Sequence, residues 1–285
     1  MRIRVDYSTV YDYSAPASDV LQLLRVQPSG HEGQHILHWR IDTDTDGHLR
    51  HSEDAYGNIT HMFYPDGPVR RLSLHVTGEV DTSETGGVLS SMHEPLPAGV
   101  FLRATPLTEA DAAIRAFARE CRGADPLASC HAMMTTLNET MVFDADVTHA
   151  YSSAAHAYGI KAGVCQDYAH IFCAAARFLG IPARYVSGHL VRDDGLVTQP
   201  AAHAWAEAQV PGLGWVAFDP TNGVCATQSY LRVAIGLDYL EAAPIRGARR
   251  GGGMESMVVS VTTSESNLGG GQASMVGQSQ SQVQG

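Results

Sequence analysis

The segment from Cys165 to Leu179 constrains the fold more than any other part of this sequence, because it is the clearest helix in the chain. Gly180 follows at a position where helices commonly end, and Pro182 prevents further helix. Strand-like sequence resumes at Ala183. The apolar positions recur at helical spacing: Tyr168, Ile171, Phe172, Ala175, Phe178 and Leu179. A helix with this apolar face, next to strands, predicts an α+β core in which helices pack on an antiparallel sheet.

The sequence before this helix divides into two parts of different character. Residues 1–80 contain short alternating runs separated by turn signals, which is typical of an antiparallel β module. Residues 81–99 form a predicted loop, because glycines and prolines interrupt them. The part that follows is rich in alanine, and helices are predicted over 112–121, 127–140 and 151–158, the first with an N-terminal cap within Thr108-Glu109-Ala110-Asp111.

The sequence after the helix is strand-like again. Strands are predicted over 183–191, 202–210 and 215–218, and a last one over 257–262, with Pro211-Gly212-Leu213-Gly214 as a hairpin turn. Serine, glutamine and glycine then dominate, which predicts disorder. We therefore expect a β module over 1–95, a helix-and-sheet domain over 96–262 that includes the C-terminal strands, and a disordered tail over 263–285.

Composition excludes several classes of protein. The chain has 285 residues, of which 44% are hydrophobic and 17% charged, so it can bury a core. A net charge of −11 argues against a nucleic-acid partner. The sequence contains no run of about 18 apolar residues, so no membrane span is predicted. Five cysteines without a secretion signal or a CxxC pair predict reduced thiols in the cytoplasm, with no metal and no cofactor. Oligomeric state cannot be predicted.

Cys165 opens the predicted helix, and this position suits a nucleophile. The unpaired N–H groups and the positive end of the helix dipole favour the thiolate, which is the reactive form of cysteine. The same N–H groups can donate to an oxyanion during acyl transfer. Gly163, two residues earlier, allows a substrate to approach the backbone closely. A structural, buried cysteine is the alternative interpretation, and it is the one we favour for Cys173, which lies about two turns further on.

A thiolate also needs a proton partner. His203 lies on one strand of the predicted hairpin and Asp219 ends the other, so the two side chains can meet across neighbouring strands. Asp219 could then hold the imidazole in the required tautomer. Trp205 and Trp215, on the same strands, would line or shield the site. A merely structural histidine and a turn aspartate are the simpler alternatives.

These residues stand in three motifs that resemble the bacterial branch of the transglutaminase-like superfamily. The motifs are GVCQDYAH (163–170), continuing to GIPARYVSG, then HAWAE (203–207) and WVAFDPT (215–221), in that order. The first 95 residues, with DAYGN at 54–58, are similar to the β region that precedes the catalytic domain in this branch. RVAIGLDY (232–239) resembles the stretch after the third motif, although Leu237 stands where a basic residue is more usual.

The resemblance implies a papain-like core and a thioester mechanism acting on peptide or protein amides. It assigns Cys165 as nucleophile, His203 as general base and then acid, and Asp219 as the residue that orients His203. We expect substrate contacts from Gly163, Gln166, Trp205 and Trp215. Attack by water would give hydrolysis, the outcome we favour, and attack by an amine would give transamidation. A catalytically silent scaffold of the same fold is the alternative.

Two further features have simple interpretations. Asp42 to Gly47, followed by Glu53, matches the spacing of a calcium-binding loop, but strand-like runs flank it on both sides, so a polar β-turn is expected. Asp167, in the first turn of the predicted helix, is expected to brace the helix start. No second oxyanion donor can be assigned, and Tyr158 is only a guess.

Overall fold

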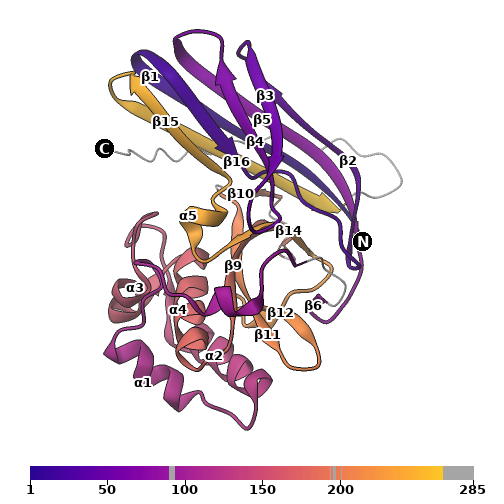
Figure 1. The fold of residues 1–285 in the computed structure, drawn as a ribbon, viewed down its shortest axis with the longest axis vertical. Coiled ribbons are helices and arrows are strands. Elements are labelled where there is room, and N and C mark those ends of the chain that lie inside the picture. Colours follow the sequence, from indigo (N-terminus) through magenta and orange to yellow (C-terminus); the bar gives the residue numbers. More distant parts are fainter. Residues whose placement is uncertain (90–93, 193, 195–196, 200, 266–285) are drawn as a thin grey trace.

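Two sheets and a set of helices make up the computed structural model, which describes residues 1–89, 94–192, 194, 197–199 and 201–265. One end of the molecule is a curled sheet, and the other holds the helices packed on a second sheet (Figure 1). The helical elements are η1 (Ala98–Leu102), α1 (Ala112–Glu120), α2 (Pro126–Thr140), α3 (Ala154–Ile160), α4 (Cys165–Phe178) and α5 (Tyr239–Ala242). The α+β class predicted from the sequence is confirmed.

The first sheet has eight strands organised around a long N-terminal one. Its members are β1 (Arg2–Leu24), β2 (Gln34–Thr43), β3 (Gly47–Glu53), β4 (Ile59–Pro65), β5 (Val69–Thr82), β10 (Thr198–Gln199), β15 (Ile245–Gly251) and β16 (Glu255–Glu265). Strand β1 pairs with β5 and β16 along its first half and with β4 and β15 near its end. Alternate residues of β1 are buried, as the period of a strand requires.

The last strands differ from the sequence prediction. We expected the segment near residue 257 to belong to the second domain, but β15 and β16 pair with β1 of the first sheet. Strand β16 also continues to Glu265, which pairs with Ile3, so residues 263–265 of the predicted tail lie in the sheet. Backbone hydrogen bonds to β1 hold these polar residues in the sheet. Composition alone cannot indicate that β1 is their partner. Residues 266–285 lie outside the described residues.

The second sheet is antiparallel and carries the helices. It consists of β6 (Val88–Leu89), β9 (Ala183–Leu190), β11 (His203–Val210), β12 (Gly214–Asp219), β13 (Val224–Cys225) and β14 (Tyr230–Gly236), with β11 between β9 and β12. The predicted hairpin is therefore confirmed. Strand β6, which pairs with β12, falls in the segment predicted to be a loop. A short parallel pair, β7 (Val142–Phe143) and β8 (Ala162–Gly163), precedes α4.

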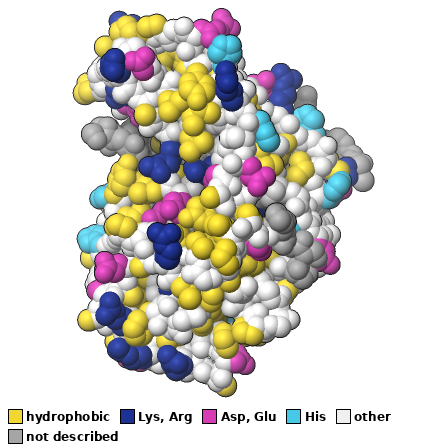
Figure 2. Space-filling view, in the orientation of Figure 1, with side chains coloured by type: hydrophobic (Ala, Val, Ile, Leu, Met, Phe, Trp, Pro, Cys, Tyr) yellow, Lys and Arg dark blue, Asp and Glu magenta, His cyan; other side chains and the backbone are white. Residues whose placement is uncertain are grey.

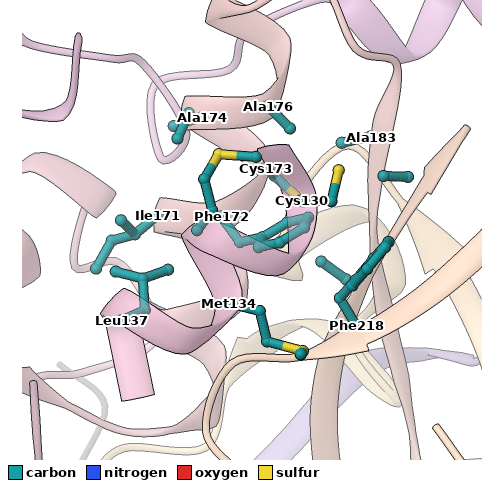
Figure 3. Packing of buried hydrophobic residues seen from close by; sticks show 14 of the residues in the cluster. Cys130, Met134, Leu137, Ile171, Phe172, Cys173, Ala174, Ala176, Ala183 and Phe218 are labelled. Carbon is teal, nitrogen blue, oxygen red and sulfur yellow. The ribbon is translucent and has the colours of Figure 1, made fainter. Parts of the chain in front are cut away.

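Helix α4 packs against the middle of this sheet and forms its core. Phe172 of α4 stacks on Phe218 of β12 with ring centroids 5.4 Å apart. Cys173 is fully buried in the same cluster, as expected, beside Cys130 and Met134 of α2 (Figure 3). Alanines occupy many of the remaining contact positions on both elements, so the helix and the sheet can approach closely.

Helix boundaries follow the capping side chains. Asp111, the last residue of the stretch predicted to cap α1, is the cap, and its Oδ1 accepts the N–H of Ile114 at 2.8 Å. The Thr108 hydroxyl instead accepts a hydrogen bond from the buried Arg177 guanidinium. Ser153 caps α3, which therefore begins three residues later than predicted.

Side-chain amides dock the first sheet onto the edge of the second. Asn58 donates to the carbonyl of Ile235 and accepts its N–H, both at 2.8 Å. Gln34 does the same for the backbone of Arg232. Asp54 fixes the turn that presents Asn58, because it accepts three hydrogen bonds from the turn and one from Arg25. The 54–58 motif is thus a docking turn on strand β14.

The predicted calcium-like loop is the turn between two strands. It joins β2 to β3, so its flanks are strands, as expected. The Oδ1 of Asp44 accepts the N–H of Ser73 at 2.7 Å, which ties the turn to β5. Among the described residues, no group of three or more His, Cys, Asp or Glu side chains could hold a metal ion. On the face in Figure 2, basic and acidic side chains are scattered rather than separated.

Candidate active site

The N-terminus of α4 presents Cys165, and a buried aspartate holds this turn in place. The Oδ2 of Asp167 accepts the N–H of Val164 at 2.8 Å and the hydroxyl of Thr148 at 2.7 Å. This is one half of a capping box. A side chain at Gly163 would put its Cβ 2.5 Å from the same Oδ2, so only glycine fits there. Burial raises the pKa of Asp167. Cys165 itself is partly exposed.

His203 and Asp219 meet at the same end of the sheet. His203 begins β11 and Asp219 ends β12, and the Nε2 of the ring lies 2.7 Å from Oδ2 of the carboxylate. The carboxylate is fully buried. Burial by itself would raise the pKa of Asp219, but the hydrogen bonds from His203 and its other donors hold it below the usual value.

Three residues that the sequence did not single out complete the shell of Asp219. The hydroxyl of Tyr230 donates to Oδ2 at 2.8 Å, and the amide of Asn222 donates to the same oxygen at 2.6 Å. The backbone N–H groups of Thr221 and Asn222 donate to Oδ1. Thr221 and Asn222 lie two and three residues after the aspartate, so an Asx turn could have been predicted. Tyr230 lies eleven residues away, and only the fold brings it here.

The His203 ring interacts with the sulfur as well as with the carboxylate. Burial by itself would lower the pKa of His203, but its hydrogen bonds to Asp219 and Cys165 raise it to about 10. Because Nε2 faces Asp219, Nδ1 is the ring nitrogen left for the sulfur. An imidazolium beside a cysteine is the environment that stabilises a thiolate. The structure thus brings the Cys165, His203 and Asp219 side chains together.

The two tryptophans belong to the core. Trp205 is 1% exposed, and its ring stacks on that of His203 with centroids 6.0 Å apart. Trp205 therefore supports one face of the His203 ring. Trp215 lies under the Arg184 guanidinium, 3.8 Å from the ring centroid, and against Phe101. Strand alternation puts both rings on the face away from α4, and Phe101 of η1 packs against Trp215 there.

Gln166 and Tyr158 also have structural partners. The Gln166 amide donates to the carbonyl of Ala150 at 3.2 Å, which ties the loop before α3 to the start of α4. Tyr158 packs on Phe117, and the Lys161 ammonium lies 3.1 Å from its ring centroid. Tyr158 therefore belongs to the helical cluster and not to the surroundings of Cys165, so the guess that it is an oxyanion donor is wrong.

Glu207 of the HAWAE motif forms a buried ion-pair network. Its carboxylate accepts from Arg184 at 2.6 Å and from Arg232 at 2.8 Å, and all three residues are buried. Burial by itself would raise the pKa of Glu207, but the two guanidinium groups hold it below its usual value. The network joins β9, β11 and β14 beneath the site. Its role is therefore to hold the strand that carries His203.

Several exposed apolar side chains belong to the segments that precede α4 in the chain, and we call this group the apolar rim. Phe143 of β7 pairs with Gly163 of β8, two residues before Cys165, and its side chain is 59% exposed. Tyr151 is 63% exposed. The rim consists of Val142, Phe143, Val147, Tyr151 and Ile160. Exposed apolar groups beside a reactive side chain are typical of a binding surface. No periodic pattern in the sequence indicates these residues.

Family models match most of the chain. The transglutaminase-like superfamily matches residues 115–220, and the bacterial transglutaminase-like N-terminal region matches residues 3–81. Uncharacterized proteins from two mycobacteria are similar over nearly the whole length. The one from Mycobacterium leprae is 29% identical over 91% of this chain and 97% of its own. The one from Mycobacterium bovis is 30% identical over 86% and 87%.

Two more distant relatives have described activities or structures. A protein-glutamine gamma-glutamyltransferase from Pseudomonas aeruginosa is 35% identical over 102 residues, which are 32% of this chain and 15% of that protein. A crystal structure from Cytophaga hutchinsonii, described as a candidate cysteine protease, is 19% identical and covers 100% of this chain and 98% of its own. Its TM-score is 0.72, so the two chains share a fold. No helix among the described residues is long and apolar enough to cross a membrane.

Proposed function

Because the chain belongs to the transglutaminase-like superfamily, we propose that it cleaves or exchanges peptide or protein amides through a cysteine nucleophile. One observation carries the proposal. The His203 ring holds Asp219 through Nε2 at 2.7 Å, and the neighbouring Cys165 side chain helps Asp219 to raise the pKa of that ring. A buried histidine with a carboxylate on one side and a thiol on the other is the arrangement that nucleophilic acyl transfer requires.

The reaction begins when the Cys165 thiolate adds to the amide carbon. A C–S bond forms, and the carbonyl electron pair moves to oxygen, which the free N–H groups of the α4 terminus stabilise. His203 then gives its proton to the departing nitrogen, the C–N bond breaks, and a thioester remains on Cys165. Asp219 keeps Nε2 engaged throughout, so that Nδ1 faces the sulfur.

The thioester has two fates. His203 can take a proton from water, which yields a carboxylic acid, or from a primary amine, which yields a new amide. We propose hydrolysis as the main outcome, because Cys165 is partly exposed and water therefore reaches the thioester. The described cysteines are all unpaired, which supports our further proposal that the protein works in the cytoplasm.

The test compares two cysteine variants on one substrate. Casein is incubated with the wild type, Cys165→Ala and Cys225→Ala, with and without a dansylated primary amine. Cys225 is also free and partly buried, so it is a matched control. We expect backbone cleavage or ammonia release by the wild type and Cys225→Ala only, and little amine incorporation. Full activity of Cys165→Ala would reject the proposal.

The silent scaffold of the same fold remains the competing proposal. It predicts that no amide is processed and that Cys165 reacts with alkylating agents no faster than Cys225. The interaction between Cys165 and His203 favours the enzyme, because a scaffold has no use for a poised thiol. An alkylation assay therefore separates the two proposals without a known substrate.

A further inference from the structure

Tyr185 lies in the small cluster that surrounds the start of α4, on strand β9. Its side chain packs with Ala169 and Ala204, and Cys165 and Tyr239 pack against the same cluster. The ring contacts His170 at 5.1 Å between centroids and Tyr239 at 6.3 Å. The residue is 2% exposed. The ring is therefore held rigidly between its neighbours, and the hydroxyl has little freedom to move.

The hydroxyl of Tyr185 is a donor that no described group of the free protein uses. Within the part of the chain that the structure describes, no residue hydrogen-bonds to it. Another polar atom at the same helix start, Oδ1 of Asp167, is buried without a partner among the described residues. Unpaired buried polar groups are unfavourable and are therefore rare in native proteins. An unused hydroxyl and an unpaired buried carboxylate oxygen, both close to Cys165, point to a polar ligand.

The hydroxyl also keeps its proton. Burial raises the pKa of Tyr185 well above its usual value, and the neighbouring Cys165 and Asp167 act in the same direction. The group is thus neutral at physiological pH and can only act as a donor or acceptor of hydrogen bonds. When negative charge develops close by, donation is strongly favoured.

We propose that Tyr185 is a catalytic residue that donates a hydrogen bond to the carbonyl oxygen of the substrate as it becomes an oxyanion. This proposal rests on the function proposed above and supplies the donor that acts beside the backbone N–H groups of α4. As the C–S bond forms, the electron pair on oxygen accepts the Tyr185 hydroxyl hydrogen without proton transfer. When the C–N bond breaks, that pair reforms the carbonyl and the hydrogen bond weakens.

The test separates the oxyanion from the thiol. Tyr185→Phe removes only the oxygen and keeps the ring contacts, and Tyr239→Phe is the matched control on the neighbouring ring. Casein hydrolysis reports the whole reaction, whereas alkylation of Cys165 by iodoacetamide forms no oxyanion. We expect kcat to fall about 100-fold in Tyr185→Phe, with KM and the alkylation rate within twofold of the wild type. Tyr239→Phe should retain its turnover.

Each other outcome overturns the inference. Turnover of Tyr185→Phe within threefold of the wild type would show that no bond to the oxyanion is lost. An alkylation rate that falls as far as kcat would show that the Tyr185 hydroxyl acts on the Cys165 sulfur rather than on the oxyanion. If the Phe variant is unstable, 4-aminophenylalanine at position 185 keeps a donor and should recover part of kcat, and no recovery would reject the role. Inactive Cys165→Ala with active Tyr185→Phe rejects this inference alone, whereas active Cys165→Ala rejects the proposed function.

Discussion

His203 and Asp219 are joined by a hydrogen bond of 2.7 Å between Nε2 and Oδ2, and four further donor groups of Thr221, Asn222 and Tyr230 converge on the same carboxylate. The carboxylate is thus fixed from several sides before it meets the ring. This rigidity determines which ring nitrogen faces Cys165. The first prediction follows from that relationship.

Asp219→Asn should leave the fold intact but lower turnover by about 10³–10⁴, because the amide no longer selects the required tautomer. The pKa of His203, which Asp219 helps to raise, should fall toward the ordinary value of about 6.5. Casein hydrolysis measures the first effect and NMR titration of the His203 ring the second. A variant with an unchanged histidine pKa would show that the carboxylate does not govern the ring.

The pH dependence of stability should carry the signature of His203. Its pKa in the folded protein is raised to about 10, so its contribution is complete below pH about 6.5 and is lost as the pH rises towards 10. Urea unfolding of the wild type and His203→Gln at pH 6 and pH 10 measures this. The free-energy difference between the two proteins should shrink at pH 10, and a constant difference would contradict the raised pKa.

Glu207→Gln should destabilise the protein by about 3–5 kcal/mol, because it leaves the buried Arg232 guanidinium without its carboxylate and leaves Arg184 with Glu94 alone. Asp12→Asn is the control, since its ion pair with Arg71 is exposed and should contribute less than about 1 kcal/mol. Denaturant unfolding gives both values. Equal effects of the two substitutions would mean that the network does not hold the strands of the second sheet.

Phe143→Ser should weaken substrate binding without changing the chemistry. The side chain is exposed, so its replacement costs little stability, but it removes apolar area from the rim beside Gly163. We expect KM for casein to rise several-fold, with kcat and the alkylation rate of Cys165 unchanged. Leu49→Ser, an exposed leucine on β3 of the other sheet, is the control. The same KM in all three proteins would show that the apolar rim does not bind substrate.

The sequence predicted the parts of this protein that depend on local pattern. Helix α4 has a regular apolar period with a glycine at its end, and the hairpin of β11 and β12 has an obvious turn, so the elements that carry Cys165, His203 and Asp219 could be anticipated. The position of these three side chains at one end of the sheet then follows from strand pairing.

What the sequence did not predict depends on long-range contacts. Tyr230 reaches Asp219, and Asn58 docks on Ile235, across separations that no local pattern encodes. Strands β15 and β16 belong to the first sheet because they pair with β1, which lies at the other end of the sequence. No local pattern indicates this pairing. Trp205 and Trp215 were expected to contact substrate, but both are buried. Their place in the motifs does not indicate which face of each strand is covered by other residues.

The pH dependence of alkylation at each cysteine of the native protein, followed by peptide mass mapping, tests the central claim most directly. We predict that Cys165 reacts with iodoacetamide at pH 6 much faster than Cys225 and the buried Cys173, and that His203→Ala abolishes this difference. Equal rates at Cys165 and Cys225, or a fast rate that persists in His203→Ala, would contradict the account, because His203 would then not activate the sulfur.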